Sequence, residues 1–191
     1  MSSFFRPDAP FSRDDLQMRI IDGPPPAGFD CGAEEQNRFL YDRAWKDHCR
    51  GVTVTHLLFI KGILGAYVTL MTDRIRLGPR ERAKGLSYQI VPAIKIAQLA
   101  VDRPFAAFGL GRYLVGYSIA TARMLRGAVG CRYLTLDADR EELVGWYEKQ
   151  GFVRNLLEQE QRREEALRRG RNPDEIAISM RFDLRDAREE N

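Results

Sequence analysis

Two glycines stand at a strand-to-helix junction in the middle of the chain. The segment AVDRPFAAFGLGRYLV, residues 100–115, runs from an apolar strand ending through a turn to Gly109-Leu110-Gly111 and then to a helical pattern. The first amides of a helix have no partner within the helix, and the helix dipole adds roughly half a positive charge there. The turn therefore predicts a backbone cradle for a phosphate group, although a Gly-x-Gly turn alone is also common where nothing binds.

A tyrosine near the end of the following helical segment could supply a proton. Tyr147 lies four residues before Gly151 in GWYEKQGF, residues 145–152. A phenol has an unperturbed pKa of about 10 and can donate its proton to a basic leaving group. Taken alone, Tyr147 is more simply interpreted as a core aromatic beside Trp146 and Phe152.

The other reactive residue types give weaker indications of a functional site. The strand segment 88–101 holds no Asp or Glu, so we expect a water molecule or an already neutral amine in place of a carboxylate base. Asp102, at the end of this strand, is expected to cap a turn. His48 and His56 are isolated, and no metal site is expected. The three cysteines are odd in number and widely spaced, which argues against a disulfide framework.

Hydrophobic periodicity and turn residues predict the elements that position these groups. We expect strands over 18–23, 52–60, 63–73, 88–101, 131–138 and 175–184, and helices over 33–49, 110–127, 140–150 and near 156–170. Lys61-Gly62 is typical of a two-residue hairpin turn, and Asp139 is expected to cap the third helix. This order predicts a mixed α/β domain with one open sheet covered by helices.

Composition places the chain among ordinary globular proteins, with 44% hydrophobic and 30% charged residues. No apolar run reaches the roughly 18 residues that span a bilayer, and the start lacks the order of a signal peptide, so a cytoplasmic protein without a membrane partner is expected. The net charge of +3 neither requires nor excludes nucleic acid. Residues 1–14 are expected to form a flexible tail and residues 15–191 a single domain.

Together, in this order and spacing, the glycine turn and the tyrosine helix resemble the GNAT superfamily of acyl-CoA-dependent N-acyltransferases. Residues 99–115 are similar to the acyl-CoA pyrophosphate loop of that family, and residues 138–152 to the helix that carries its general acid. The resemblance covers about residues 29–152 and the last strand. It implies a central mixed, splayed sheet flanked by helices, to which the charged helix before the last strand is an addition.

The resemblance also implies roles for individual residues, with acetyl-CoA as acyl donor and no metal. Its pantetheine arm would pair with the strand backbone, its pyrophosphate would lie on the turn amides, and an amide near Leu99 or Ala100 would polarise the thioester carbonyl. A primary amine would attack directly, and Tyr147 would protonate the departing sulfur. The implied cofactor-binding residues are Leu99, Ala100, Val101, Phe108, Gly109, Leu110, Gly111 and Arg112.

Ala106 departs from the family loop, which usually carries Gln or Arg at that position. Phosphate binding is then expected to depend on the backbone and on Arg112 or Arg103. Phe105 and Phe108 are expected to pack under the loop or against the cofactor, with a partner surface as the alternative. The departure also favours an alternative function, a catalytically weak acyl-CoA-binding or interaction module on the same fold.

A closer resemblance lies in residues 29–59, FDCGAEEQNRFLYDRAWKDHCRGVTVTHLLF. The Phe-x-Cys-Gly opening, the aromatic helix and Gly51, Thr53 and Thr55 are similar to GNAT-type toxins of toxin–antitoxin systems, which acetylate the amino acid on charged tRNA. The resemblance implies aminoacyl-tRNA as one acceptor among primary amines and an antitoxin as a partner. A homodimer is a further expectation. The charged segment 154–171 is expected to be a solvated helix in preference to a polyanion site.

Overall fold

The computed structural model describes residues 5–6, 8–83 and 85–185. The chain divides into two compact units, one of Met1–Met71 with Ile96–Ala120 and the other of Thr72–Lys95 with Thr121–Asn191. We call them the first and the second unit. Residues 1–4 and 7 of the predicted tail lie outside the described residues, and the flexible tail and the single domain stay predictions.

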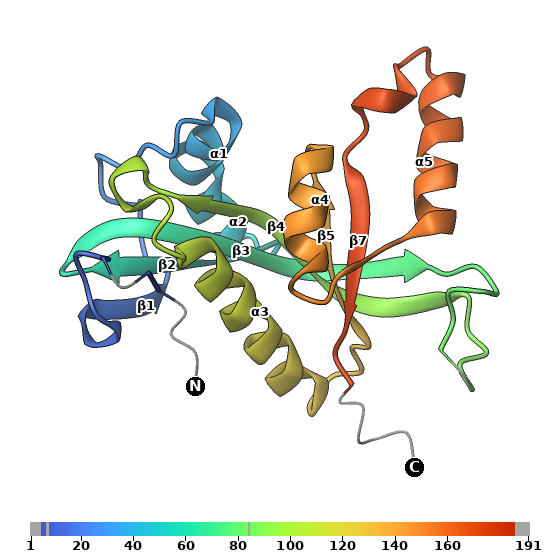
Figure 1. Ribbon diagram of the computed structural model, residues 1–191, viewed down its shortest axis with the longest axis horizontal. Coiled ribbons are helices and arrows are strands. Elements are labelled where there is room, and N and C mark those ends of the chain that lie inside the picture. The colour runs from blue at the N-terminus through green and yellow to red at the C-terminus, as the bar shows by residue number, and fades with distance from the viewer. Residues whose placement is uncertain (1–4, 7, 84, 186–191) are drawn as a thin grey trace. The chain divides into compact units, whose positions relative to one another are not determined.

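Among the described residues, seven strands form one open mixed sheet, in the order β1-β2-β3-β4-β5-β7-β6 (Figure 1). Their bounds are β1 Leu16–Ile20, β2 Val54–Ile60, β3 Ile63–Arg76, β4 Ile90–Val101, β5 Tyr133–Ala138, β6 Val153–Arg154 and β7 Ile178–Asp183. The predicted open α/β sheet is confirmed, and only the two-residue β6 was not expected.

The first unit contains an antiparallel meander. β1 pairs with β2, and β2 pairs with β3 down to the Ile60–Ile63 pair at the turn. Lys61 and Gly62 have φ angles of 49° and 84°, and positive φ at both central residues gives the turn type whose twist matches the flanking strands. The predicted hairpin is therefore confirmed.

The first predicted helix is one continuous run with an unexpected middle. It consists of α1 Glu34–Arg38, a π-helical segment Phe39–Ala44 and α2 Trp45–Cys49. Leu40 and Ala44 are fully buried in the core of the first unit, where the ring of Phe39 stacks on Tyr67. The apolar face that predicted this helix thus forms the cover of the first unit's sheet.

α3, Leu110–Arg126, follows β4 and a short turn. Its apolar face buries Leu114, Val115 and Ala122, each at most 1% exposed. The period of three to four residues predicted this helix, and the structure ends it one residue before the predicted Gly127.

In the second unit, β5 pairs antiparallel with β7, and β7 pairs with β6. α4, Glu141–Glu148, has Arg140 at its N-cap position, with extended angles and no side-chain cap hydrogen bond. The predicted Asp139 cap is therefore wrong, because the chain enters the helix one residue later. Gly151 follows the helix with φ 92°, the left-handed conformation that ends helices.

The predicted charged helix before the last strand is present as α5, Leu156–Arg168, and lies beside β7 (Figure 1). Its N-cap residue, Asn155, makes no side-chain cap hydrogen bond. The cap comes instead from Glu81, whose carboxylate accepts from the amides of Leu156 and Leu157 at 2.7 and 3.0 Å. Within the described residues, no helix is long and apolar enough to cross a bilayer.

Candidate functional site

The end of β4 is fixed by a buried aspartate. Asp102, 6% exposed, caps a short 3-10 turn, Arg103–Phe105, and accepts from the amides of Arg103 and Asp30 at 3.1 and 2.8 Å. The predicted capping role of Asp102 is confirmed. This carboxylate is thus occupied by backbone donors and sets the direction in which the chain leaves the strand.

The turn that follows carries two residues with positive φ. Ala107 has φ 64° and Gly109 has φ 96°. The Tyr113 amide donates to the Gly109 carbonyl at 3.0 Å, so the helical hydrogen-bond ladder of α3 begins there. By helix geometry, the amides of Leu110, Gly111 and Arg112 precede that ladder, so the helix itself supplies no acceptor for them. A non-glycine residue in the left-handed region costs about 1 kcal/mol, and such strain clusters at functional turns.

Aromatic rings of the N-terminal segment pack against this turn. Phe11 is 7% exposed, and its ring centroid lies 6.1 Å from that of Phe105 and 6.0 Å from that of Phe108. Phe5 lies 5.6 Å from Tyr113 on the first turn of α3. The described aromatic residues of the N-terminal segment therefore pack against the loop, in line with the expectation that Phe105 and Phe108 pack beneath it.

The three strand residues implied for pantetheine lie on alternate faces of β4. Ala100 is 6% exposed and belongs to the core of the first unit. Leu99 and Val101 are half-buried on the opposite face. The adjacent Arg103 does not extend toward the turn amides as a free cation, because its guanidinium pairs with Asp30 at 2.9 Å. Of the two arginines expected to help the loop, only Arg112 stands on the helix end itself.

Tyr147 lies on α4 in an apolar setting. It is 9% exposed, and its ring contacts Trp146 and Phe152 with centroids 4.8 and 5.7 Å away, both edge-on. Burial, helped by the negative charge of Asp139, raises the pKa of the Tyr147 phenol to about 12. The phenol is therefore fully protonated near neutral pH and can act as a proton or hydrogen-bond donor.

The predicted cofactor-binding residues, Leu99 through Val101 and Phe108 through Arg112, all belong to the first unit. The structure brings them together as one strand end, turn and helix start. Tyr147 belongs to the second unit.

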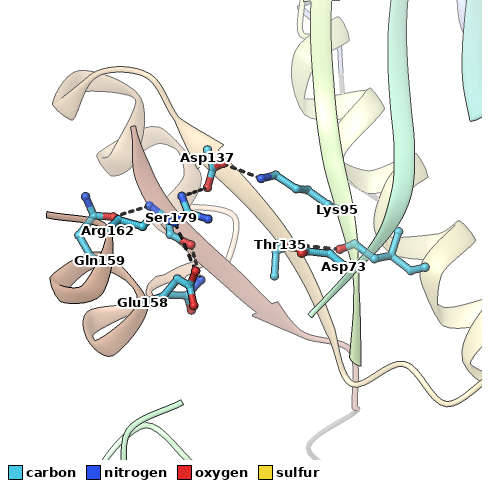
Figure 2. Close-up of polar contacts among 10 residues, drawn as sticks. Asp73, Lys95, Thr135, Asp137, Glu158, Gln159, Arg162 and Ser179 are labelled. Carbon is cyan, nitrogen blue, oxygen red and sulfur yellow. Dashed lines mark hydrogen bonds and ion pairs between the residues drawn. The ribbon is translucent and has the colours of Figure 1, made fainter. Parts of the chain in front are cut away.

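Sequence reasoning missed a half-buried charge cluster in the second unit. Figure 2 shows Asp137 of β5 between Lys95 of β4 and Arg162 of α5, at 2.6 and 2.7 Å. Burial alone would raise the pKa of Asp137, but the charges of Lys95 and Arg162 outweigh it and hold that pKa below its usual value. On the same strand, Thr135 donates to Asp73 at 2.7 Å (Figure 2).

This cluster fixes α5 to the sheet. Gln159 of α5 accepts from the backbone amide of Ser179 in β7 at 2.9 Å, and Arg162 also pairs with Glu158 (Figure 2). Apart from Glu158 and Arg162, which are one helical turn apart, these partners are 20 to 42 residues apart in sequence, so no local pattern could have paired them. The strand position of Asp137, in an otherwise apolar run, was the only available signal.

Among the described residues, no group of three or more His, Cys, Asp or Glu side chains could hold a metal ion. The His56 ring, 6% exposed, is hydrogen-bonded through Nδ1 to the Tyr117 hydroxyl at 2.9 Å. Burial lowers the pKa of His56. The described contacts thus give this histidine a packing role.

The fold was compared with known proteins. No model of a protein family matches the sequence. Solved structures match nearly the whole chain. The toxin AtaT in complex with acetyl-methionyl-tRNAfMet is 22% identical, with a TM-score of 0.71 over 88% of this chain and 95% of that one. The chain has the GNAT fold of such toxins.

Two further structures agree. A tyrosine-to-phenylalanine mutant of AtaT, bound to acetyl-CoA and the C-terminus of the antitoxin AtaR, is 23% identical, with a TM-score of 0.66 over 90% of this chain and 94% of that one. A tyrosine-to-phenylalanine mutant of KacT is 22% identical, with a TM-score of 0.70 over 89% and 95%. The predicted fold class is confirmed, including its likeness to toxins of this kind.

Proposed function

We propose that this protein is an acetyl-CoA-dependent N-acetyltransferase whose acceptor is the amino group of an aminoacyl-tRNA. The observation that carries the proposal is the shared fold over about nine tenths of the chain with AtaT, for which structures with acetyl-CoA and with acetyl-methionyl-tRNA exist. An antitoxin partner belongs to the same proposal, since AtaT has also been solved with the C-terminus of AtaR.

The turn before α3 fits the pyrophosphate of acetyl-CoA. The first amides of α3, those of Leu110 and Gly111, and the positive end of this 17-residue helix provide donors and charge without a basic side chain. Ala106 and Ala107 add little bulk beside them. This arrangement compensates for the missing Gln or Arg at position 106, because the strained turn holds the amides in place before binding.

The reaction forms a carbon–nitrogen bond between the acetyl group and the acceptor amine, and it breaks the thioester carbon–sulfur bond. Negative charge that develops on the thioester oxygen would be stabilised by a backbone amide near Leu99 or Ala100. The departing thiolate would take a proton from Tyr147, and the attacking nitrogen would lose one to water. No carboxylate stands on this part of β4 to serve as a base.

The raised pKa of Tyr147 predicts how the activity depends on pH. Because the pKa of the Tyr147 phenol is raised to about 12, the phenol stays protonated through pH 10, and its ionisation should cause no loss of activity between about pH 7 and 10. A free phenol would already be half ionised at about pH 10.

The test is the variant Tyr147→Phe, assayed by release of free thiol from acetyl-CoA with methionyl-tRNA as acceptor. We expect kcat to fall by about 100-fold or more while the dissociation constant for acetyl-CoA stays within about twofold, since the ring packing is kept. Tyr133→Phe, at another buried tyrosine of the second unit, is the matched control and should keep full turnover.

Three outcomes separate the candidate functions. Unchanged turnover in Tyr147→Phe would exclude this residue as the general acid. Thiol release with other amines but not with charged tRNA would leave an acetyltransferase of different acceptor class. Binding of acetyl-CoA without thiol release for any acceptor would identify a catalytically weak acyl-CoA-binding module.

A further inference from the structure

A polar hollow lies in the second unit between the end of β3 and α5. Arg74 and Arg76 are two residues apart on β3, so their side chains leave the same face of the strand, while Ile75 between them is buried at 2% exposure. These residues line a hollow of about 170 Å³ together with Ile90, Glu158 and Gln161. At about 30 Å³ for each water molecule, the hollow has room for roughly five or six of them, or for one phosphate group with some of its water.

Neither arginine has a charged partner within the described part of the chain. Among those residues, the structure records no ion pair or hydrogen bond for the guanidinium of Arg74 or of Arg76. The carboxylate in the hollow, Glu158, is paired with Arg162, 3.4 Å away. Unneutralised guanidinium groups around a hollow form a ready site for an anion, because their planar donors match the oxygens of a phosphate.

The lining carries a net positive charge. Arg74 and Arg76 contribute two positive charges, and the one carboxylate of the lining, Glu158, is already paired with Arg162 outside it. This charge is sufficient to neutralise the single negative charge of a backbone phosphodiester. Ile90 at the rim is 43% exposed and offers an apolar contact for a sugar.

We infer that this hollow binds a backbone phosphate of the tRNA acceptor. The inference rests on the proposed function, and it gives the charged helix α5 a role. Gln161 of α5 forms one wall of the site, and the half-buried contacts of Arg162 with Asp137 and of Gln159 with Ser179 keep that wall in place.

The test compares two double variants of full-length protein by fluorescence anisotropy with uncharged tRNA, between about 50 and 300 mM salt. Arg74→Gln with Arg76→Gln removes the two charges of the hollow. Arg13→Gln with Lys46→Gln removes two exposed charges that have no recorded ion pair in the described residues of the first unit. Thermal unfolding and acetyl-CoA binding of both variants serve as checks on folding.

We expect the hollow variant to reduce the slope of log affinity against log salt by about 0.7 to 0.9 for each RNA phosphate that the protein no longer neutralises. At about 0.1 M salt this corresponds to a roughly 5- to 8-fold weaker tRNA affinity for each such phosphate. The control variant should keep the wild-type slope, and both variants should bind acetyl-CoA as the wild type does.

The outcomes distinguish this inference from the proposed function. If the wild type binds and acetylates methionyl-tRNA and the hollow variant has the slope of the control, the inference is overturned while the function stands. If the wild type binds acetyl-CoA but no tRNA, the tRNA acceptor and this inference both fail. If inorganic phosphate stabilises the wild type but not the hollow variant, and tRNA affinity is the same in both, the hollow is a site for free phosphate and the RNA assignment is wrong.

Discussion

Replacing Glu81 with glutamine should weaken the attachment of α5 to the second unit. Each carboxylate oxygen of Glu81 accepts two donors: Oε1 takes the Leu156 amide at 2.7 Å and Arg181 Nη1 at 3.0 Å, and Oε2 takes the Gly78 and Leu157 amides, both at 3.0 Å. Glutamine keeps one oxygen and presents an NH2 group in place of the other. Two donors would therefore lose their acceptor and face a further donor.

The magnitude follows from these contacts and from their burial. A buried donor without an acceptor costs about 1–3 kcal/mol, so two of them cost about 2–6 kcal/mol. The Glu81 and Arg181 side chains are 6% and 10% exposed, and breaking such a buried pair costs about 3–5 kcal/mol. For a chain of this size that loss lowers the melting temperature by about 6–20 °C.

Thermal and urea unfolding of Glu81→Gln at pH 7 would measure this loss. The control is Glu160→Gln, the same substitution at an exposed position of α5, which should change stability by no more than about 0.5 kcal/mol. A difference between the two variants below about 1 kcal/mol would refute the view that Glu81 supplies the cap of α5.

The effect should also depend on pH in a defined direction. Burial raises the pKa of Glu81, but its four donors outweigh burial and hold the pKa below its usual 4.5. Because the folded pKa is the lower one, the stabilisation is present above pH 4.5 and is lost as the pH falls through the folded value. The difference between wild type and Glu81→Gln should therefore shrink toward pH 3.

Two further substitutions test the loop and the half-buried charge cluster. Gly109→Ala places a side chain at φ 96° and should cost about 1–3 kcal/mol of stability and weaken acetyl-CoA binding by titration calorimetry, whereas Gly127→Ala, at an ordinary φ, should do neither. Asp137→Asn leaves Lys95 and Arg162 beside a neutral group and should cost about 1–3 kcal/mol by urea unfolding at pH 7. Because the pKa of Asp137 is lowered, that loss should fade as the pH drops below about 4, and a loss that persists at pH 3 would contradict an ionic origin.

Local patterns were sufficient to predict most elements. Apolar runs and three-to-four-residue periods predicted the strands and helices, Lys61-Gly62 predicted the hairpin, and Gly109 with Gly111 predicted the turn between strand and helix. These features depend on residues close in sequence, whose conformational preferences are largely independent of the rest of the chain. The Asp139 cap failed because two adjacent positions could both begin the helix and the packed chain selected Arg140.

The motif residues of the candidate site were also identified from the sequence, through their order and spacing. The sequence alone could not predict the raised pKa of the Tyr147 phenol, because the value of about 12 arises from burial. Nor could it predict that Phe11 packs against Phe105 and Phe108, because these contacts join segments more than 90 residues apart. Arg103 was expected to be available to phosphate, and only the folded chain placed it against Asp30.

The sequence by itself determined the fold class, the glycine turn and the tyrosine helix, because each is encoded in a short run of residues. Only the tertiary structure decided what α5 does. As a sequence it is a charged, solvated helix. In the folded chain, Glu81 caps it from 75 residues away, and Asp137 holds its Arg162. Hydrophobic periodicity identifies the buried face of a helix, but the ion pairs between distant segments form only when those segments pack together.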